Sequence, residues 1–332
     1  MVIEDPRMNS TLSADGSDAQ IISFEVVGVD LLVFVILDYS LGTIIMVTNG
    51  FLFFTIYHDP CRCLRTPSVF LIASLSVADF FVGVVSFLRG AELTYFYRGL
   101  GDLLILNLVE YFIGAVSILA AVSTLMAMSY EHYVAVIKPF QYPHKITNKK
   151  AKIAIAVTWI NGLIMSVLPI ADVKRENFLL AYCYSHFVIP SSVLTAVYVK
   201  IYRAIFRQSE ELRNVRASLT AANRRKQLER ENRMVIMFAM ILLAFFLSFI
   251  PYFIHVQILY FCSCRNTYSY KVYYLVANEF LSVSSMINPF MYAWRLPKFN
   301  HSLRSWFRHR RLTRNVVVAW NGAKCNENPV IG

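Results

Sequence analysis

Long apolar runs recur along the sequence and decide what this chain can fold into. A helix needs about 20 apolar residues to cross a bilayer, and seven runs approach that length, near 31–57, 67–88, 103–130, 151–171, 178–205, 234–261 and 272–294. The 332 residues are 57% hydrophobic and only 16% charged, whereas a soluble domain carries roughly 25% charged residues. We therefore predict an all-α membrane protein, a seven-transmembrane helix bundle without a large soluble domain.

Basic residues are distributed unevenly among the segments that join these runs. With the amino terminus outside, seven of the 32 Lys and Arg fall on the outer side, at Arg7, Arg89, Arg98, Lys174, Arg175, Arg265 and Lys271, and the other 25 lie inside. Positive charge favours the cytoplasmic side, so the bias predicts a multi-pass plasma-membrane protein with an extracellular amino terminus. It also accounts for the net charge of +11 without a nucleic-acid partner. Asn9 begins an N-glycosylation sequon that suits the outer side.

Three polar residues lie in the middle of apolar runs, where ionisable and polar groups are costly. Asp79 stands in SLSVADFFVGVV, Asn49 in VTNGF and Asn288 in SSMINPFMY. If the helices bundle, the carboxylate gains two amide partners. The arrangement predicts either a structural knot of hydrogen bonds or an ion or proton site, and the residues alone do not choose between them.

Enzyme chemistry finds no support in the sequence. There is no HExxH metal motif, no phosphate-binding loop and no nucleophile beside a matched base, so we expect neither a catalytic nor a metal site. A transporter is the main competing class, because charge inside a membrane can mark an ion path. Transporters commonly contain internal repeats, and no repeat is evident here.

The seven runs and their landmarks resemble the rhodopsin-like (class A) G-protein-coupled receptors over about residues 30–308. The resemblance implies an extracellular segment at 1–30, a seven-transmembrane receptor domain at 31–294, and helix 8 with a cytoplasmic tail at 295–332. It also implies an extracellular ligand, a heterotrimeric G protein and membrane lipids as partners. The matching residues are Asn49, Leu75, Asp79, Trp159, Pro190, Tyr198, Phe245, Pro251 and the NPFMY stretch from Asn288 to Tyr292.

The triplet Glu131-His132-Tyr133 occupies the position of the family's D/E-R-Y motif. The resemblance implies that it faces the G protein, together with Tyr198, Glu231 and Pro139. Histidine replaces the usual arginine. Two nearby carboxylates, Glu131 and Glu231, would favour the charged imidazole and hold an inactive pairing; alternatively, His132 only caps a helix end.

Other positions also depart from the family pattern. Asn107 stands where a cysteine usually ties the third helix to the second outer loop, and that loop contains no cysteine. Phe249 replaces the usual tryptophan of the sixth helix. Ala121 replaces a serine of the family's sodium pocket, while Asp79, Ser285 and Asn288 remain. The resemblance therefore implies a weakened sodium site near Asp79, and it groups the core switch residues as Asp79, Asn49, Ser285, Asn288, Phe249 and Tyr292.

Candidate ligand contacts lie near the outer ends of the helices. Gly114 stands where aminergic receptors carry an aspartate, which argues against a monoamine. Acidic residues at Glu92, Asp102 and Glu110 would attract a basic peptide or amine, or are ordinary charges at the membrane edge. The predicted ligand-binding residues are Glu110, Tyr111, Gly114, Glu92, Asn278 and His255.

The outer loops also resemble those of one branch of the family. A short second outer loop, the missing disulfide and the Cys262/Cys264 pair are similar to the melanocortin, adenosine and cannabinoid receptor branch, although Pro190 departs from the melanocortin pattern. Cys262 and Cys264 either pair with each other or serve separately. A second interpretation of the whole chain is a receptor-shaped protein with little signalling, a ligand sink or partner subunit, because both His132 and Phe249 alter family switches.

Overall fold

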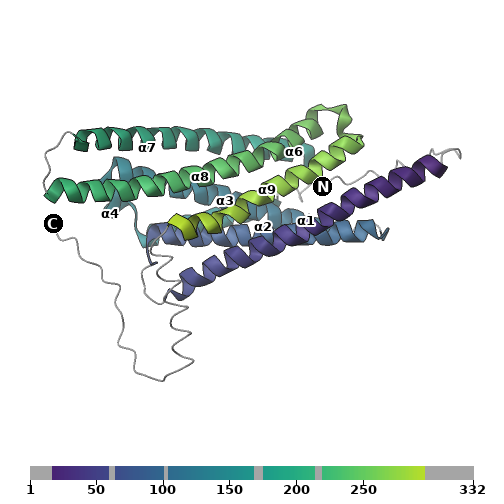
Figure 1. Ribbon diagram of the computed structural model, residues 1–332, viewed down its shortest axis with the longest axis horizontal. Helices are drawn as coiled ribbons and strands as arrows, with labels where there is room; N and C mark the ends of the chain where they lie inside the picture. The colour runs from purple at the N-terminus through teal and green to yellow at the C-terminus, as the bar shows by residue number, and fades with distance from the viewer. Residues whose placement is uncertain (1–16, 60–63, 101–103, 168–174, 214–218, 296–332) are drawn as a thin grey trace, which may run out of the picture.

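The computed structural model describes residues 17–59, 64–100, 104–167, 175–213 and 219–295, and this part of the chain is almost wholly helical, without a strand. The long helices run along one common axis and form an elongated bundle (Figure 1). They are α1 (Ser17–His58), α2 (Pro67–Tyr97), α3 (Leu104–Ile137), α5 (Asn148–Val167), α6 (Arg175–Cys183), α7 (Ile189–Arg213), α8 (Leu219–Phe261) and α9 (Tyr268–Arg295). Short helices η2 (Pro139–Gln141), α4 (Tyr142–Lys145), η4 (Tyr184–Val188) and η5 (Ser263–Asn266) join them.

All seven predicted apolar runs form helices. Within the described residues, six segments are long and apolar enough to span a membrane. One of these, Leu179–Glu211, includes η4 and most of α6 and α7. The seventh run is α9, which is 28 residues long but more polar. Its inward-facing side includes Glu279, Ser282, Ser285 and Asn288, all of them buried.

The first two helices approach each other unusually closely. A Cβ atom added at Gly42 of α1 would lie 2.8 Å from the Gly83 carbonyl oxygen of α2, and one added at Gly83 would lie 2.9 Å from the Gly42 carbonyl oxygen. Small residues allow such backbone contact between membrane helices. α1 also begins at Ser17, well ahead of residue 31 where the apolar run starts.

The fifth span is interrupted where the sequence places Pro190. α6 ends at Cys183, a turn of π-helix, η4, follows, and α7 begins at Ile189 with Pro190 in its first turn. Proline has no amide hydrogen to donate, so the regular hydrogen-bond ladder cannot pass through this position. The π turn absorbs the irregularity and carries Phe187 into the core.

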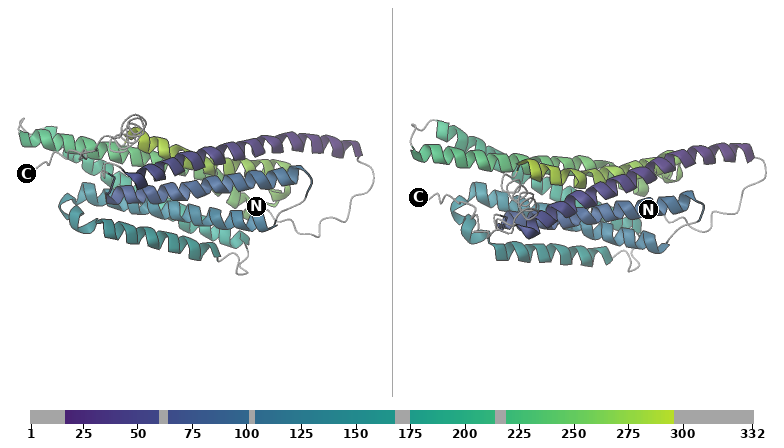
Figure 2. Two further views of the ribbon diagram at one scale, coloured as in Figure 1. Left: turned by 90° about the horizontal axis from the view of Figure 1, so that it is seen from below. Right: turned by 60° about the horizontal axis from the view of Figure 1, so that its bottom comes forward.

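α3 forms the centre of the bundle and contacts α2, α5, α7 and α8. Its buried residues Leu119, Leu125 and Met128 belong to the main apolar core. α5 lies at the edge of the bundle (Figure 2), and large apolar side chains such as Ile160 and Ile164 are exposed on it. In a membrane protein, such a surface faces lipid.

α7 and α8 continue beyond the apolar runs near 178–205 and 234–261. α8 has 43 residues, which corresponds to about 65 Å at 1.5 Å per residue. The hydrocarbon core of a bilayer is only about 30 Å thick. The two helices lie side by side in Figure 1 and contact each other.

Candidate functional site

Asp79 is the centre of a buried polar cluster in the middle of the bundle. Its carboxylate accepts hydrogen bonds from Ser285 Oγ at 2.7 Å and Asn288 Nδ2 at 2.8 Å. Asn49 joins through α9, because its Nδ2 donates to the Ser285 carbonyl oxygen at 3.0 Å. The three polar residues expected to meet therefore do so, and Ser285 links them.

A small cavity lies against this cluster. Its volume is about 30 Å³, and Asp79, Ala121, Phe245, Ser285 and Asn288 are among its lining residues. This volume is about that of one water molecule in the liquid. The cavity has room for a water molecule or a monatomic ion, but not for an organic ligand.

Phe249 and Tyr292, the other two predicted switch residues, are also in the core. The Phe249 ring stacks on Phe187 of η4, with ring centroids 4.2 Å apart, and packs on Phe245 at 5.7 Å. Tyr292 is completely buried. Phe249 therefore connects α8 to the irregular turn of the fifth span.

A larger cavity opens toward the end of the bundle where α2 ends and α3 begins. Its volume is about 100 Å³. Four of the six predicted ligand-binding residues line it, namely Glu110, Tyr111, Gly114 and Asn278. The remaining lining residues are Val82, Val85, Arg89, Ala115, Ile118, Leu179, Tyr182, Tyr252, Tyr274, Leu281 and Ser282.

The other two predicted ligand-binding residues do not line this cavity. His255 is buried, lies 3.1 Å from the Tyr270 hydroxyl through its Nδ1, and stacks on the Tyr270 ring at 5.5 Å between centroids. Glu92 accepts a hydrogen bond from Asn107 Nδ2 at 2.7 Å. Asn107, which replaces the family's cysteine, thus joins α3 to α2 by a hydrogen bond.

An ion cluster beside the larger cavity was missed by the sequence analysis. Arg89 Nε donates to Asp38 Oδ2 at 3.1 Å, its Nη2 contacts the other Asp38 oxygen, and Nη2 also lies 3.3 Å from Glu279 Oε1. Assigning Arg89 to an outer loop was therefore wrong, because α2 continues to Tyr97 and Arg89 is only 6% exposed. The available signals were Asp38 within the first apolar run and Arg89 directly after the second one.

Glu131 connects three helices at the other end of the bundle. Its Oε1 accepts hydrogen bonds from Ser68 Oγ of α2 at 2.5 Å and from the Tyr142 hydroxyl of α4 at 2.8 Å. Burial and the Glu131 carboxylate raise the pKa of Tyr142 above its ordinary value. The phenol therefore remains protonated and continues to donate at physiological pH.

His132 turns back onto its own helix. Its Nδ1 lies 2.6 Å from the Met128 carbonyl oxygen, and the side chain is buried. Tyr133 and Tyr198 pack on an apolar cluster of Val136, Ile201 and Val235 between α3, α7 and α8. Pro139 is exposed at the start of η2.

Several predicted features lie outside the described residues. They are Asn9, Asp102, the side chain of Glu231, and residues 296–332 of the expected helix 8 and cytoplasmic tail. For these, the sequence-based expectations stand as they were.

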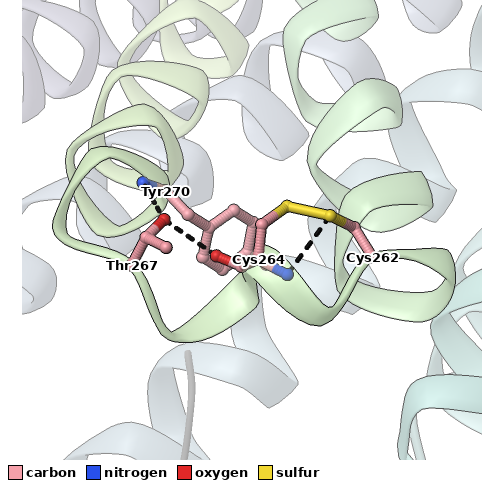
Figure 3. Close-up of a disulfide and its surroundings, with 4 residues drawn as sticks. All are labelled: Cys262, Cys264, Thr267 and Tyr270. Carbon is pink, nitrogen blue, oxygen red and sulfur yellow. Dashed lines mark hydrogen bonds between the residues drawn. A yellow bond between two sulfur atoms is a disulfide. The ribbon is translucent and has the colours of Figure 1, made fainter.

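Cys262 and Cys264 form a disulfide with each other, which decides between the two alternatives for this pair (Figure 3). The Cys264 amide donates to the Cys262 sulfur at 3.2 Å, and Thr267 Oγ1 donates to the Cys264 carbonyl at 2.8 Å. The bridge closes the turn between α8 and α9. It does not connect α3 to an outer loop.

Comparison with known proteins is consistent with this geometry. The model of the 7 transmembrane receptor (rhodopsin family) matches residues 48–292. The chain is 25% identical over 316 residues to trace amine-associated receptor 7a of Rattus norvegicus, covering 84% of each chain, and 24% identical over 284 residues to adenosine receptor A2a of Canis lupus familiaris, covering 76% of this chain and 66% of the relative.

Among solved structures, squid rhodopsin matches with a TM-score of 0.73 and 18% identity, covering 85% of this chain and 87% of that one. This likeness establishes the fold, and the family match extends over most of the bundle. The family consists of receptors rather than enzymes. The chain belongs to the rhodopsin family of seven-transmembrane, G-protein-coupled receptors.

Proposed function

We propose that this plasma-membrane receptor has an extracellular amino terminus, binds a small extracellular ligand in the 100 Å³ cavity and transmits binding to a heterotrimeric G protein. The cavity carries this proposal, because four predicted ligand residues line it. Tyr252 of its wall also packs on Phe249, with centroids 5.6 Å apart. A ligand that displaces Tyr252 would therefore press on the Phe249 ring of α8.

The other end of the bundle supports the G-protein step. Phe140 beside Pro139 is 94% exposed, a large apolar surface that invites a protein partner. The extended helices α7 and α8 carry exposed Arg203, Arg207, Arg225 and Arg233. Such residues suit contact with anionic lipid head groups or acidic partner surfaces.

We propose that the Asp79 cluster binds a sodium ion. Asp79, Ser285 and Asn288 border the 30 Å³ cavity and supply oxygen atoms, which are the ligands that hard cations prefer. Asn288 Oδ1 is buried and has no hydrogen-bond partner among the described residues. Ala121 contributes no oxygen, so we propose weaker sodium binding than a serine there would give.

The second candidate is a receptor-shaped protein that does not signal. The hydrogen bonds of Glu131 favour this candidate. Glu131 is already engaged by Ser68 and Tyr142, and His132 contacts its own helix. Such an arrangement would keep this end of the bundle closed even without the pairing to Glu231 that the sequence suggested.

Basal nucleotide exchange by a panel of heterotrimeric G proteins, measured with the purified chain in lipid nanodiscs, tests both candidates. We expect measurable exchange with the native chain and faster exchange with His132→Arg. Exchange only by His132→Arg would favour the non-signalling candidate. If neither chain promotes exchange, with or without ligands that bind the cavity, G-protein coupling is rejected.

A further inference from the structure

The larger cavity is small, and its size restricts what can enter it. Its volume is about 100 Å³, and an engineered cavity of about 150 Å³ holds benzene. A ligand, or the part of a ligand that is buried, therefore has only a few non-hydrogen atoms. The chemistry of the wall then decides which small group is favoured.

The basic residue in the wall is already engaged. Arg89 lines the cavity, but two nitrogens of its guanidinium contact both carboxylate oxygens of Asp38. Glu279 Oε1 lies 3.3 Å from the same guanidinium. A buried arginine paired in this way has little positive charge left for an anionic ligand.

Carboxyl groups are in excess around this arginine. Glu110 lines the cavity and lies close enough to attract Arg89, and Glu92 lies beside Glu110. Asp38, Glu92, Glu110 and Glu279 thus outnumber Arg89 by four to one. Glu279 Oε2 is buried without a hydrogen-bond partner among the described residues. Carboxyl groups this close together in a low-dielectric site cannot all be ionised on their own, and an ammonium group bound between them would favour their charged forms.

Tyrosine rings form the remainder of the polar wall. The four are Tyr111 of α3, Tyr182 of α6, Tyr252 of α8 and Tyr274 of α9, so one ring comes from each of four helices. Tyr182 lies near both Tyr111 and Tyr252. Aromatic faces attract organic cations, and a site with several such rings around one carboxylate is suited to an ammonium group.

We propose that the cavity binds a small organic cation, with its ammonium group between Glu110 and the four tyrosine rings. This inference rests on the proposed function, because it names the ligand class of the same cavity. Gly114, where aminergic receptors carry an aspartate, lies one helical turn from Glu110 on the same face of α3. The Glu110 carboxylate thus lies one turn nearer the amino-terminal end of α3 than the aspartate of aminergic receptors.

Three compounds of nearly identical shape provide the test. Choline is a cation, 3,3-dimethylbutan-1-ol is its neutral isostere and 3,3-dimethylbutanoate is a related anion. Saturation-transfer NMR on the full chain in nanodiscs would detect the methyl signal of each. We expect transfer to choline alone. Equal transfer to the neutral compound, preferred transfer to the anion, or no transfer to any of the three would overturn the proposal.

Variants separate charge and aromatic contributions. Glu110→Gln should weaken choline binding by roughly tenfold, and Tyr252→Leu by a similar factor, whereas Tyr252→Phe keeps the aromatic face and should retain binding. Glu211→Gln removes an exposed acid of α7, far from the cavity, and serves as the matched control. If Glu211→Gln weakens binding as much as Glu110→Gln, choline binds through general charge and the proposal fails.

Nucleotide exchange, measured on the same preparations, distinguishes this inference from the proposed function. Choline binding that depends on Glu110 establishes the cation site whether or not exchange occurs. Exchange by the native chain without choline binding leaves the receptor function intact and rejects the cation. If the folded native chain shows neither choline binding nor nucleotide exchange, both the cation site and the receptor function are rejected.

Discussion

At the scale of single residues, the Asp79 cluster shows how one buried acid organises its neighbours. Asp79→Ala would leave the Ser285 hydroxyl and the Asn288 amide without their acceptor, and each buried unpaired group costs about 1–3 kcal/mol. Asp79→Asn keeps one acceptor oxygen. We expect Asp79→Ala to lower the unfolding temperature in detergent clearly more than Asp79→Asn does. Equal losses for the two variants would contradict this account of the cluster.

The proposed sodium ion is tested on the same residue. Sodium chloride should raise the unfolding temperature of the native chain above the value in potassium chloride at equal ionic strength, because a ligand that binds only the folded state stabilises it. The difference should vanish in Asp79→Asn and grow in Ala121→Ser. If sodium and potassium have the same effect on the native chain, no selective site exists.

Residues differ in how far the sequence alone could place them. Asp79, Asn49 and Asn288 could be brought together by reasoning, since polar groups in apolar spans must find one another. Arg89 was not placed, because it follows the apolar run 67–88 and was assigned to the outer side, whereas α2 continues to Tyr97 and buries it. His255 was placed near the ligand from its span, but its contacts point it toward Tyr270.

At the scale of helices, the contact between α1 and α2 depends on two glycines. Gly42→Ala or Gly83→Ala would force backbone atoms apart, since the added methyl group would lie 2.8–2.9 Å from a facing carbonyl oxygen. Overpacking of this kind costs about 1–3 kcal/mol. Gly50→Ala is the control, because its nearest contact would be an ordinary 3.5 Å to Phe80. Thermal unfolding should separate the two glycines from Gly50.

The short helix α4 is held to α3 mainly through one hydroxyl. Tyr142→Phe removes the hydrogen bond to Glu131 while keeping the ring, and hydrogen bonds to charged groups contribute about 1.5–3 kcal/mol. We expect this variant to raise basal nucleotide exchange, because Glu131 is freed from α4. Tyr130→Phe, on an exposed neighbour, should leave exchange unchanged. Unaltered exchange in Tyr142→Phe would mean that this contact does not restrain the bundle.

Helix boundaries were predictable where hydrophobicity decides them and less so elsewhere. The seven apolar runs gave the right number and order of spans. The π turn η4 was not predicted, although Pro190 marked the place, because proline favours a kink without specifying its geometry. α2 also extends beyond residue 88 to Tyr97, since the buried ion cluster lets charged residues stay within the helix.

At the scale of the whole molecule, the proposed orientation can be tested through the sequon at Asn9. When the chain is expressed in mammalian cells, glycosidase treatment should increase its mobility on a gel, and Asn9→Gln should abolish that change. A second sequon, Asn300-His301-Ser302, lies on the proposed inner side and should stay unmodified. Glycan that persists in Asn9→Gln and disappears in Asn300→Gln would reverse the orientation.

The disulfide between Cys262 and Cys264 closes a loop within one turn and joins no two distant segments. Among the described residues, the bundle is therefore held by packing, hydrogen bonds and the ion pairs of Arg89 with Asp38 and Glu279, and Cys183 is a free, buried thiol. Mechanically, the chain therefore has no disulfide that ties one helix to another among the described residues. Pulled by one end from a membrane, it should unravel helix by helix to nearly its full contour length, and a reducing agent should leave the order of the force peaks unchanged.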